Sequence, residues 1–212
     1  MPQEHVQSTI PFLKIWRQEL TAITGPERSA ALLADAQTEY DVMLARETFP
    51  PNKALKKHVH DFILPGTAMY RALVSAGYER QEAATTVLSL FEAAFNRRRS
   101  LMSLLGRLPF AFALFKALSR ISMKNMLPAE GWDIEWRDEG PDCLAYDISR
   151  CFYMDWTNRL DAAELMLVFC DCDDFVFNAL APKIIWKRTK TLCRGGDVCD
   201  FRFYRGNAGY RE

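Results

Sequence analysis

Apolar residues recur at helical spacing through the first half of the chain. Ile10, Leu13, Trp16 and Leu20 would form one face of a helix over residues 8–22. The same spacing and its Pro and Gly interruptions predict further helices over residues 26–48, from residue 52 to a break at Pro65-Gly66, over 67–76 and over 81–95.

The most apolar segment covers residues 101–118. Arg107, Pro109 and Lys116 interrupt it, so its apolar run falls well short of the ~20 residues that a transmembrane helix needs. We therefore expect a buried helix here and no membrane span. Such a helix would also suit the lining of an apolar pocket or a dimer interface, which leaves a homo-oligomer open.

Helical spacing gives way to alternation after Pro128–Gly131. Trp132–Arg137 alternates as a strand, and a second strand is expected over residues 143–154. A helix over residues 161–178 and a hairpin over residues 184–203 follow. We expect a single α+β domain over residues 1–212, in which an N-terminal helical layer (1–127) packs on a C-terminal antiparallel sheet with one long helix (132–205).

The C-terminal segment also predicts which side chains share a face. Gly195-Gly196 lies between two strand-like runs, which indicates a tight turn. A loop of even length centred on these glycines would put Asp200 and Arg202 on one face of the sheet. The opposite face would then carry Trp186, Arg188, Lys190, Cys199, Phe201 and Phe203. On the preceding helix, three- and four-residue spacing groups Cys170, Asp173, Asp174 and Phe177.

Composition narrows the function classes. The 212 residues contain 27 basic and 27 acidic side chains, so no net charge favours a nucleic-acid partner. Met1–His5 lacks the basic start and apolar core of a secretory signal, so we expect a cytoplasmic protein. Its six cysteines are then expected to be reduced thiols.

Several motifs together resemble the L-2-amino-thiazoline-4-carboxylic acid hydrolase family. The motifs are Arg150-Cys151-x-Tyr153, Cys170-x-x-Asp173, Arg188-Thr189-x-Thr191 and Gly195-Gly196-Asp197-x-Cys199-Asp200-Phe201-x-Phe203. A weaker similarity extends upstream through Tyr70-Arg71-Ala72-Leu73, so that the resemblance covers about residues 50–205. It implies hydrolytic opening of a cyclic aminothiazoline acid to N-carbamoyl-cysteine, or a related reaction on a small-molecule substrate.

Such a ring opening needs a nucleophile, a proton shuttle and a cation for the substrate carboxylate. A thiolate suits the attack where a nearby positive charge lowers its pKa, as Arg188 could do for Cys199. Asp173 or Asp200 would act as base or orient water, and Arg188 could instead bind the carboxylate. The resemblance adds Cys151 and Cys170 to the catalytic candidates and Tyr153 to the substrate-binding ones.

Other interpretations of the same residues stay open. Cys151, Cys170 and Cys199 with Asp173 could bind zinc or another divalent metal and activate water, although the paired Cys-x-x-Cys spacing is missing, and no cofactor is predicted. Any one cysteine alone is equally well explained as a small buried apolar residue. A non-catalytic small-molecule sensor with a cysteine-lined pocket is the main alternative function, and an oxidant-sensitive thiol protein is a third.

Overall fold

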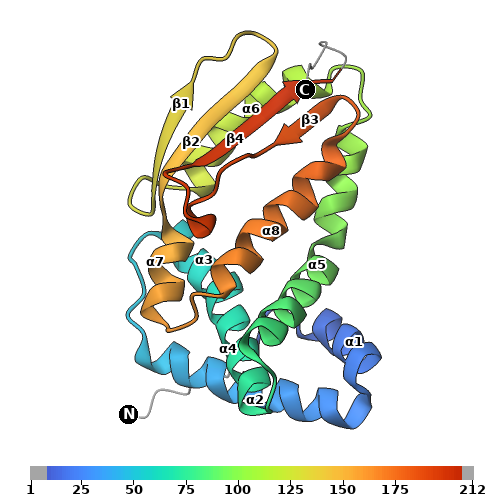
Figure 1. Cartoon of the computed structure of the whole chain (residues 1–212), viewed down its shortest axis with the longest axis vertical. Coiled ribbons are helices and arrows are strands. Elements are labelled where there is room, and N and C mark those ends of the chain that lie inside the picture. Colours follow the sequence, from blue (N-terminus) through green and yellow to red (C-terminus); the bar gives the residue numbers. More distant parts are fainter. Residues whose placement is uncertain (1–8, 207–212) are drawn as a thin grey trace. The chain divides into compact units, whose positions relative to one another are not determined.

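The computed structural model describes residues 9–206, which fall into two compact units (Figure 1). The first unit comprises the chain up to Ala94 together with Thr157–Leu165. The second comprises Phe95–Trp156 and the chain from Met166 onward. The single domain expected from the sequence stays a prediction, and each unit is described by itself.

The first unit is helical and forms around a core of large side chains. Its elements are α1 (Leu13–Thr24), α2 (Pro26–Arg46), α3 (Lys53–His58), the π-helical turn η1 (Val59–Ile63), α4 (Leu64–Ser75) and the first part of α5 (Arg80–Leu105). Trp16 and Phe91 are fully buried and meet edge to face with ring centroids 5.3 Å apart. The predicted helices are present with changed ends: the first begins at Leu13 instead of residue 8, which lies outside the described residues, and the helix predicted over 81–95 continues to Leu105.

The break predicted at Pro65-Gly66 is wrong. The chain stays helical from Lys53 to Ser75, because the backbone widens into the π-helical turn η1 just before the proline. The amide of Leu64 then bonds to the carbonyl of Val59, five residues back. Pro65 falls in the first turn of α4, where its missing amide proton costs little.

The second unit contains a four-stranded antiparallel sheet, so the α+β class is confirmed. Its strands are β1 (Trp132–Arg137), β2 (Cys143–Cys151), β3 (Ile184–Lys187) and β4 (Cys199–Arg205), in the order β1-β2-β4-β3. Its helices are the rest of α5, α6 (Ala111–Met126), α7 (Phe152–Arg159) up to Trp156, α8 (Leu165–Phe177) from Met166, and the 3-10 turns η2 (Asn178–Leu180) and η3 (Leu192–Arg194).

One face of the sheet is apolar and packs on two helices. Phe203 of β4 contacts Phe115 of α6 and Phe177 of α8, with ring centroids 4.8 and 5.2 Å apart. Trp186 pairs with Phe203 across β3 and β4, and Phe201 and Phe203 are buried. The predicted sharing of a face between Trp186 and the odd-numbered residues of β4 is therefore confirmed.

The structure differs from the predicted elements of the motif region in three places. The first strand of the motif region ends at Cys151 instead of residue 154, because α7 begins at Phe152. The long helix begins at Leu165, since Asp161 adopts a left-handed conformation with φ of 52°. Gly195-Gly196 does not form the tight turn of a hairpin but follows the 3-10 turn η3.

The buried helix expected over residues 101–118 is also wrong. The segment divides between the end of α5 and the start of α6, and Leu104 and Phe110 are 63% and 65% exposed. The division follows from Gly106, where an added Cβ would lie 2.1 Å from the carbonyl oxygen of Leu180, so only glycine allows this approach. Within residues 9–206, no helix is both long and apolar enough to cross a membrane.

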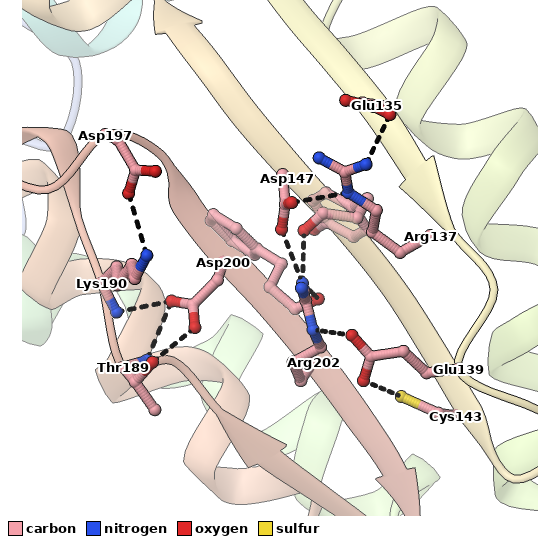
Figure 2. A network of polar contacts seen from close by, with 12 residues as sticks. Glu135, Arg137, Glu139, Cys143, Asp147, Thr189, Lys190, Asp197, Asp200 and Arg202 are labelled. Carbon is pink, nitrogen blue, oxygen red and sulfur yellow. Dashed lines mark hydrogen bonds and ion pairs between the residues drawn. The ribbon is translucent and has the colours of Figure 1, made fainter.

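The opposite face of the sheet carries a network of charges (Figure 2). Asp147 of β2 bonds to Arg137 Nε at 2.7 Å and Arg202 Nη1 at 2.9 Å. Burial alone would raise the pKa of Asp147, but the hydrogen bonds from both arginines outweigh it and lower that pKa. The network therefore joins β1, β2 and β4 through one carboxylate.

We expect Asp147→Ala to lower the free energy of unfolding by about 1–3 kcal/mol at pH 7, since it removes the buried carboxylate that Arg137 and Arg202 share. Because the folded-state pKa of Asp147 is depressed, its contribution is present above the unfolded pKa and is lost as the pH falls. The difference should thus shrink toward pH 3. Urea unfolding measures this, with Glu135→Ala as control, because Glu135 pairs with Arg137 at an exposed position and should change stability by less than about 0.5 kcal/mol. Equal effects of the two substitutions would contradict this role of Asp147.

Candidate functional site

Arg188 follows β3 and is almost completely buried, with 3% of its side chain exposed. Its Nη2 lies 2.8 Å from Asp174 Oδ2 and donates to the carbonyl oxygen of Cys170 at 2.9 Å. Trp186 Nε1 donates to the other oxygen of Asp174 at 2.9 Å. These bonds hold the chain after β3 against α8. Asp173 and Asp174 both face Arg188, which agrees with their predicted position on one side of this helix.

Aromatic rings and carboxylates keep the Arg188 guanidinium charged. It lies over the rings of Phe201 and Trp186, with Cζ 5.4 and 5.6 Å from their centroids. Burial alone would lower the pKa of Arg188, but the charges of Asp173 and Asp174 outweigh it and raise that pKa. Arg188 is therefore a permanent positive charge inside the second unit.

Two thiols meet beside this charge. Cys170 Sγ of α8 and Cys193 Sγ of η3 are 3.2 Å apart, and the Thr191 hydroxyl lies 3.3 Å from Cys193 Sγ. The hydrogen bond with Cys170 is the main cause that lowers the pKa of Cys193 to about 6, and Thr191, Arg194 and Arg188 add to it against the effect of burial. The same contact raises the pKa of Cys170. The two thiols share one hydrogen bond, and within this pair Cys193 ionises more readily than Cys170.

The glycine pair positions Cys193. Gly195 has φ of 82°, and the amides of Gly195 and Gly196 bond back to the carbonyls of Leu192 and Thr191. A Cβ on Gly196 would lie 2.9 Å from the Thr191 carbonyl oxygen, so a larger residue would displace the loop. The Gly-Gly motif therefore closes a compact loop that presents the half-buried Cys193 to Cys170.

Cys199 does not have the lowered pKa that a neighbouring Arg188 was expected to give it. Burial raises the pKa of this thiol, and the opposing effects of the Leu192 amide and the Arg188 charge do not compensate. Cys199 Sγ accepts a hydrogen bond from Leu192 N at 3.2 Å, so it anchors the start of η3. Burial likewise raises the pKa of Cys151, at the end of β2, to about 11.

Asp173 is the acidic group with the most perturbed ionisation at this site. Surrounding protein desolvates its carboxyl and raises its pKa to about 7, while Arg188, 3.6 Å away, and Arg98 oppose the rise. Because 43% of the side chain is exposed, water offsets part of this desolvation and a substrate can reach the carboxyl. The charge of Asp173 also acts on the buried hydroxyls of Tyr146 and Tyr153 and raises their pKa values beyond the rise that burial causes.

The structure thus brings together most of the residues expected from the sequence. Cys170 and Asp173 both interact with Arg188. The charge of Arg188 acts on Cys199, and the charge of Asp173 acts on Cys151. Tyr153 packs on Phe169 of α8, with ring centroids 4.7 Å apart. Asp200 does not join them. It lies with the charged face of the sheet and accepts hydrogen bonds from Thr189 N, Thr189 Oγ1 and Lys190 N, which shape the loop after Arg188 (Figure 2).

Sequence reasoning missed Cys193. The face argument assumed two regular strands, whereas Cys193 reaches Cys170 through the 3-10 turn η3. Its position two residues after Thr191 and just before the glycine pair is the signal that would have singled it out. Within residues 9–206, no group of three or more histidine, cysteine or acidic side chains is arranged to hold a metal ion, so the zinc alternative has no assembled ligand set there.

We expect Cys193 to be the thiol that iodoacetamide alkylates fastest at pH 7, with a rate that rises with pH, reaches half its maximum near the thiol pKa of about 6 and then levels off. Cys170→Ala removes the hydrogen bond that favours the thiolate and should slow this alkylation about tenfold at pH 7. Cys143→Ala is the matched control, because Cys143 lies near Glu139, away from Cys193. Peptide mass spectrometry measures the rates; an unchanged rate in Cys170→Ala would show that the sulfur contact does not set the pKa.

Comparison with known proteins gives one family. The model of the L-2-amino-thiazoline-4-carboxylic acid hydrolase family matches residues 56–203, more than half of the chain and including every residue of the site described above. No curated protein and no solved structure matches the chain. The matched length confirms the resemblance seen in the motifs: the chain belongs to the L-2-amino-thiazoline-4-carboxylic acid hydrolase family.

Proposed function

We propose that this protein is a hydrolase that opens the ring of 2-amino-thiazoline-4-carboxylate, or of a closely related cyclic amidine acid, with Cys193 as nucleophile. Membership of the family supports the hydrolase class. The observation that carries the proposal is the 3.2 Å contact of the Cys193 and Cys170 sulfurs, beside the exposed carboxyl of Asp173 and the buried charge of Arg188. An ionised thiol with a proton donor and an acid–base group beside it is what the ring opening requires.

The first step would form a bond between the Cys193 thiolate and the amidine carbon of the ring. The bond between that carbon and the ring sulfur then breaks, and the sulfur leaves as a thiol after taking up a proton. Water next attacks the same carbon, and the Cys193–carbon bond breaks to release N-carbamoyl-cysteine and the thiolate. Over both steps one water is consumed and no oxidant is needed.

Asp173 is the proposed proton shuttle. With a pKa of about 7, it is partly protonated at neutral pH and can give a proton to the departing ring sulfur. The resulting carboxylate can then take a proton from the attacking water. Asp174 is poorly suited to this role, because both of its oxygens already bind Arg188 and Trp186.

Arg98 is a better candidate than Arg188 for binding the substrate carboxylate. Arg188 is 3% exposed and engaged by Asp174 and the Cys170 carbonyl, so it orders the site and is not available as an open fork. Arg98 of α5 is exposed, acts electrostatically on Asp173 and Tyr153, and makes no ion pair with any residue in 9–206. Arg98→Gln should then raise KM more than it lowers kcat.

The direct test is thiol release from 2-amino-thiazoline-4-carboxylate by purified, reduced protein. We expect Cys193→Ser to lower kcat/KM by at least about a thousandfold, because the nucleophile is lost. Asp173→Asn should lower it by about 10²–10⁴-fold, the usual contribution of a positioned acid–base group. Cys143→Ser should retain wild-type activity within about twofold.

Circular dichroism and thermal unfolding establish that each variant is folded. Activity retained in a folded Cys193→Ser variant would remove this residue as nucleophile. Absence of thiol release by the wild-type protein, with no reaction on related cyclic amidine acids either, would contradict the hydrolase proposal. Unchanged kinetics in Arg98→Gln would remove Arg98 from substrate binding.

A further inference from the structure

A hollow lies in the second unit between the end of α5 and η2, the turn that follows α8. Its volume is about 480 Å³, within the roughly 300–1,000 Å³ range of sites for small molecules. Its lining includes Arg99, Ser103, Leu104 and Arg107 from the α5 end and Asn178 and Ala179 from η2. It shares no residue with the thiol site around Arg188.

The charge of this hollow is one-sided. Arg99 and Arg107 both contribute to the lining, and no acidic side chain does. Neither arginine makes an ion pair with a residue in 9–206, although the chain as a whole has equal numbers of acidic and basic residues. Two guanidinium groups that line one hollow without a counter-charge favour the binding of an anion there.

The helix end does not need these arginines to satisfy its carbonyl groups. The amides of Gly106, Arg107 and Leu108 bond to the carbonyls of Met102, Leu104 and Leu105, and Lys183 N bonds to the Gly106 carbonyl. Basic residues at a helix C-terminus usually compensate unpaired carbonyl groups. This role does not account for Arg99 and Arg107, because backbone amides already bond to these carbonyls.

The walls are also held in a defined shape. Gly106 brings the α5 end into backbone contact with Leu180, where a Cβ would lie 2.1 Å from the carbonyl oxygen. The Arg99 guanidinium lies over the Phe175 ring with Cζ 5.0 Å from the centroid, which orients it beside the hollow. In residues 9–206, Ser103 and the Asn178 amide have no hydrogen-bond partner, so both can donate to a ligand.

We propose that this hollow binds a small organic anion, a phosphate monoester or a polycarboxylate. The two arginines would neutralise its charge, Ser103 and Asn178 would donate hydrogen bonds, and Leu104 and Ala179 would contact its carbon atoms. The volume of this open hollow suits a metabolite. This site does not depend on the hydrolase activity proposed for the thiol site.

Isothermal titration with glycerol 3-phosphate and with citrate, at constant ionic strength kept by sodium chloride, tests the proposal. At least one anion should bind the wild-type protein, and the one that binds identifies phosphate or carboxylate as the recognised group. The double variant Arg99→Gln/Arg107→Gln should bind at least about thirtyfold more weakly, since two charge-assisted contacts are lost. Arg97→Gln is the control, because it removes one arginine charge from α5 outside the hollow, and it should change affinity less than about threefold.

Ser103→Glu provides a second test that keeps both arginines and the Phe175 contact. A carboxylate inside the hollow should compete with the anion and weaken binding at least about tenfold. The proposal is overturned if neither anion binds, if binding survives both the double variant and Ser103→Glu, or if Arg97→Gln weakens it as much as the double variant does. Thermal unfolding of each variant separates loss of binding from loss of structure.

Discussion

The ion pair between Arg188 and Asp174 is the interaction on which the site depends. Burying a guanidinium is costly unless its donors are matched, and here a carboxylate, a backbone carbonyl and two aromatic faces match them. The pair joins the chain after β3 to α8, and the ion pair of Arg194 with Asp171 joins η3 to the same helix. Without Asp174, the buried guanidinium would keep only the more distant carboxylate of Asp173 as a counter-charge.

The Arg188 charge acts in the same direction on two thiols whose pKa values shift in opposite directions, because burial and hydrogen bonding differ between them. Arg188 favours the thiolate at both Cys193 and Cys199, but burial dominates at Cys199 and raises its pKa. At Cys193 the hydrogen bond from Cys170 decides the outcome. A hydrogen-bonded thiol pair therefore favours one thiolate among several cysteines, which a nearby cation alone does not do.

Sequence patterns predicted those features that depend on regular spacing. Helical periodicity located the helices of the first unit, and alternation placed Trp186 with Phe203 and Asp200 on the other face. The same patterns did not predict three places where the backbone is irregular. These are the π-helical turn before Pro65, the close approach of the backbone at Gly106 and the 3-10 turn that carries Cys193. Each depends on a contact between residues distant in the chain or on a local hydrogen-bond pattern that residue spacing does not encode.

The most direct test of the central claim is to identify the residue that becomes covalently attached to substrate during turnover. The protein is mixed with 2-amino-thiazoline-4-carboxylate, quenched in acid within one turnover, digested and mapped by mass spectrometry. The account predicts a mass increase of one substrate molecule on the peptide that contains Cys193, and none in Cys193→Ser. Turnover with Cys193 unmodified, or an adduct on Cys199, would contradict it.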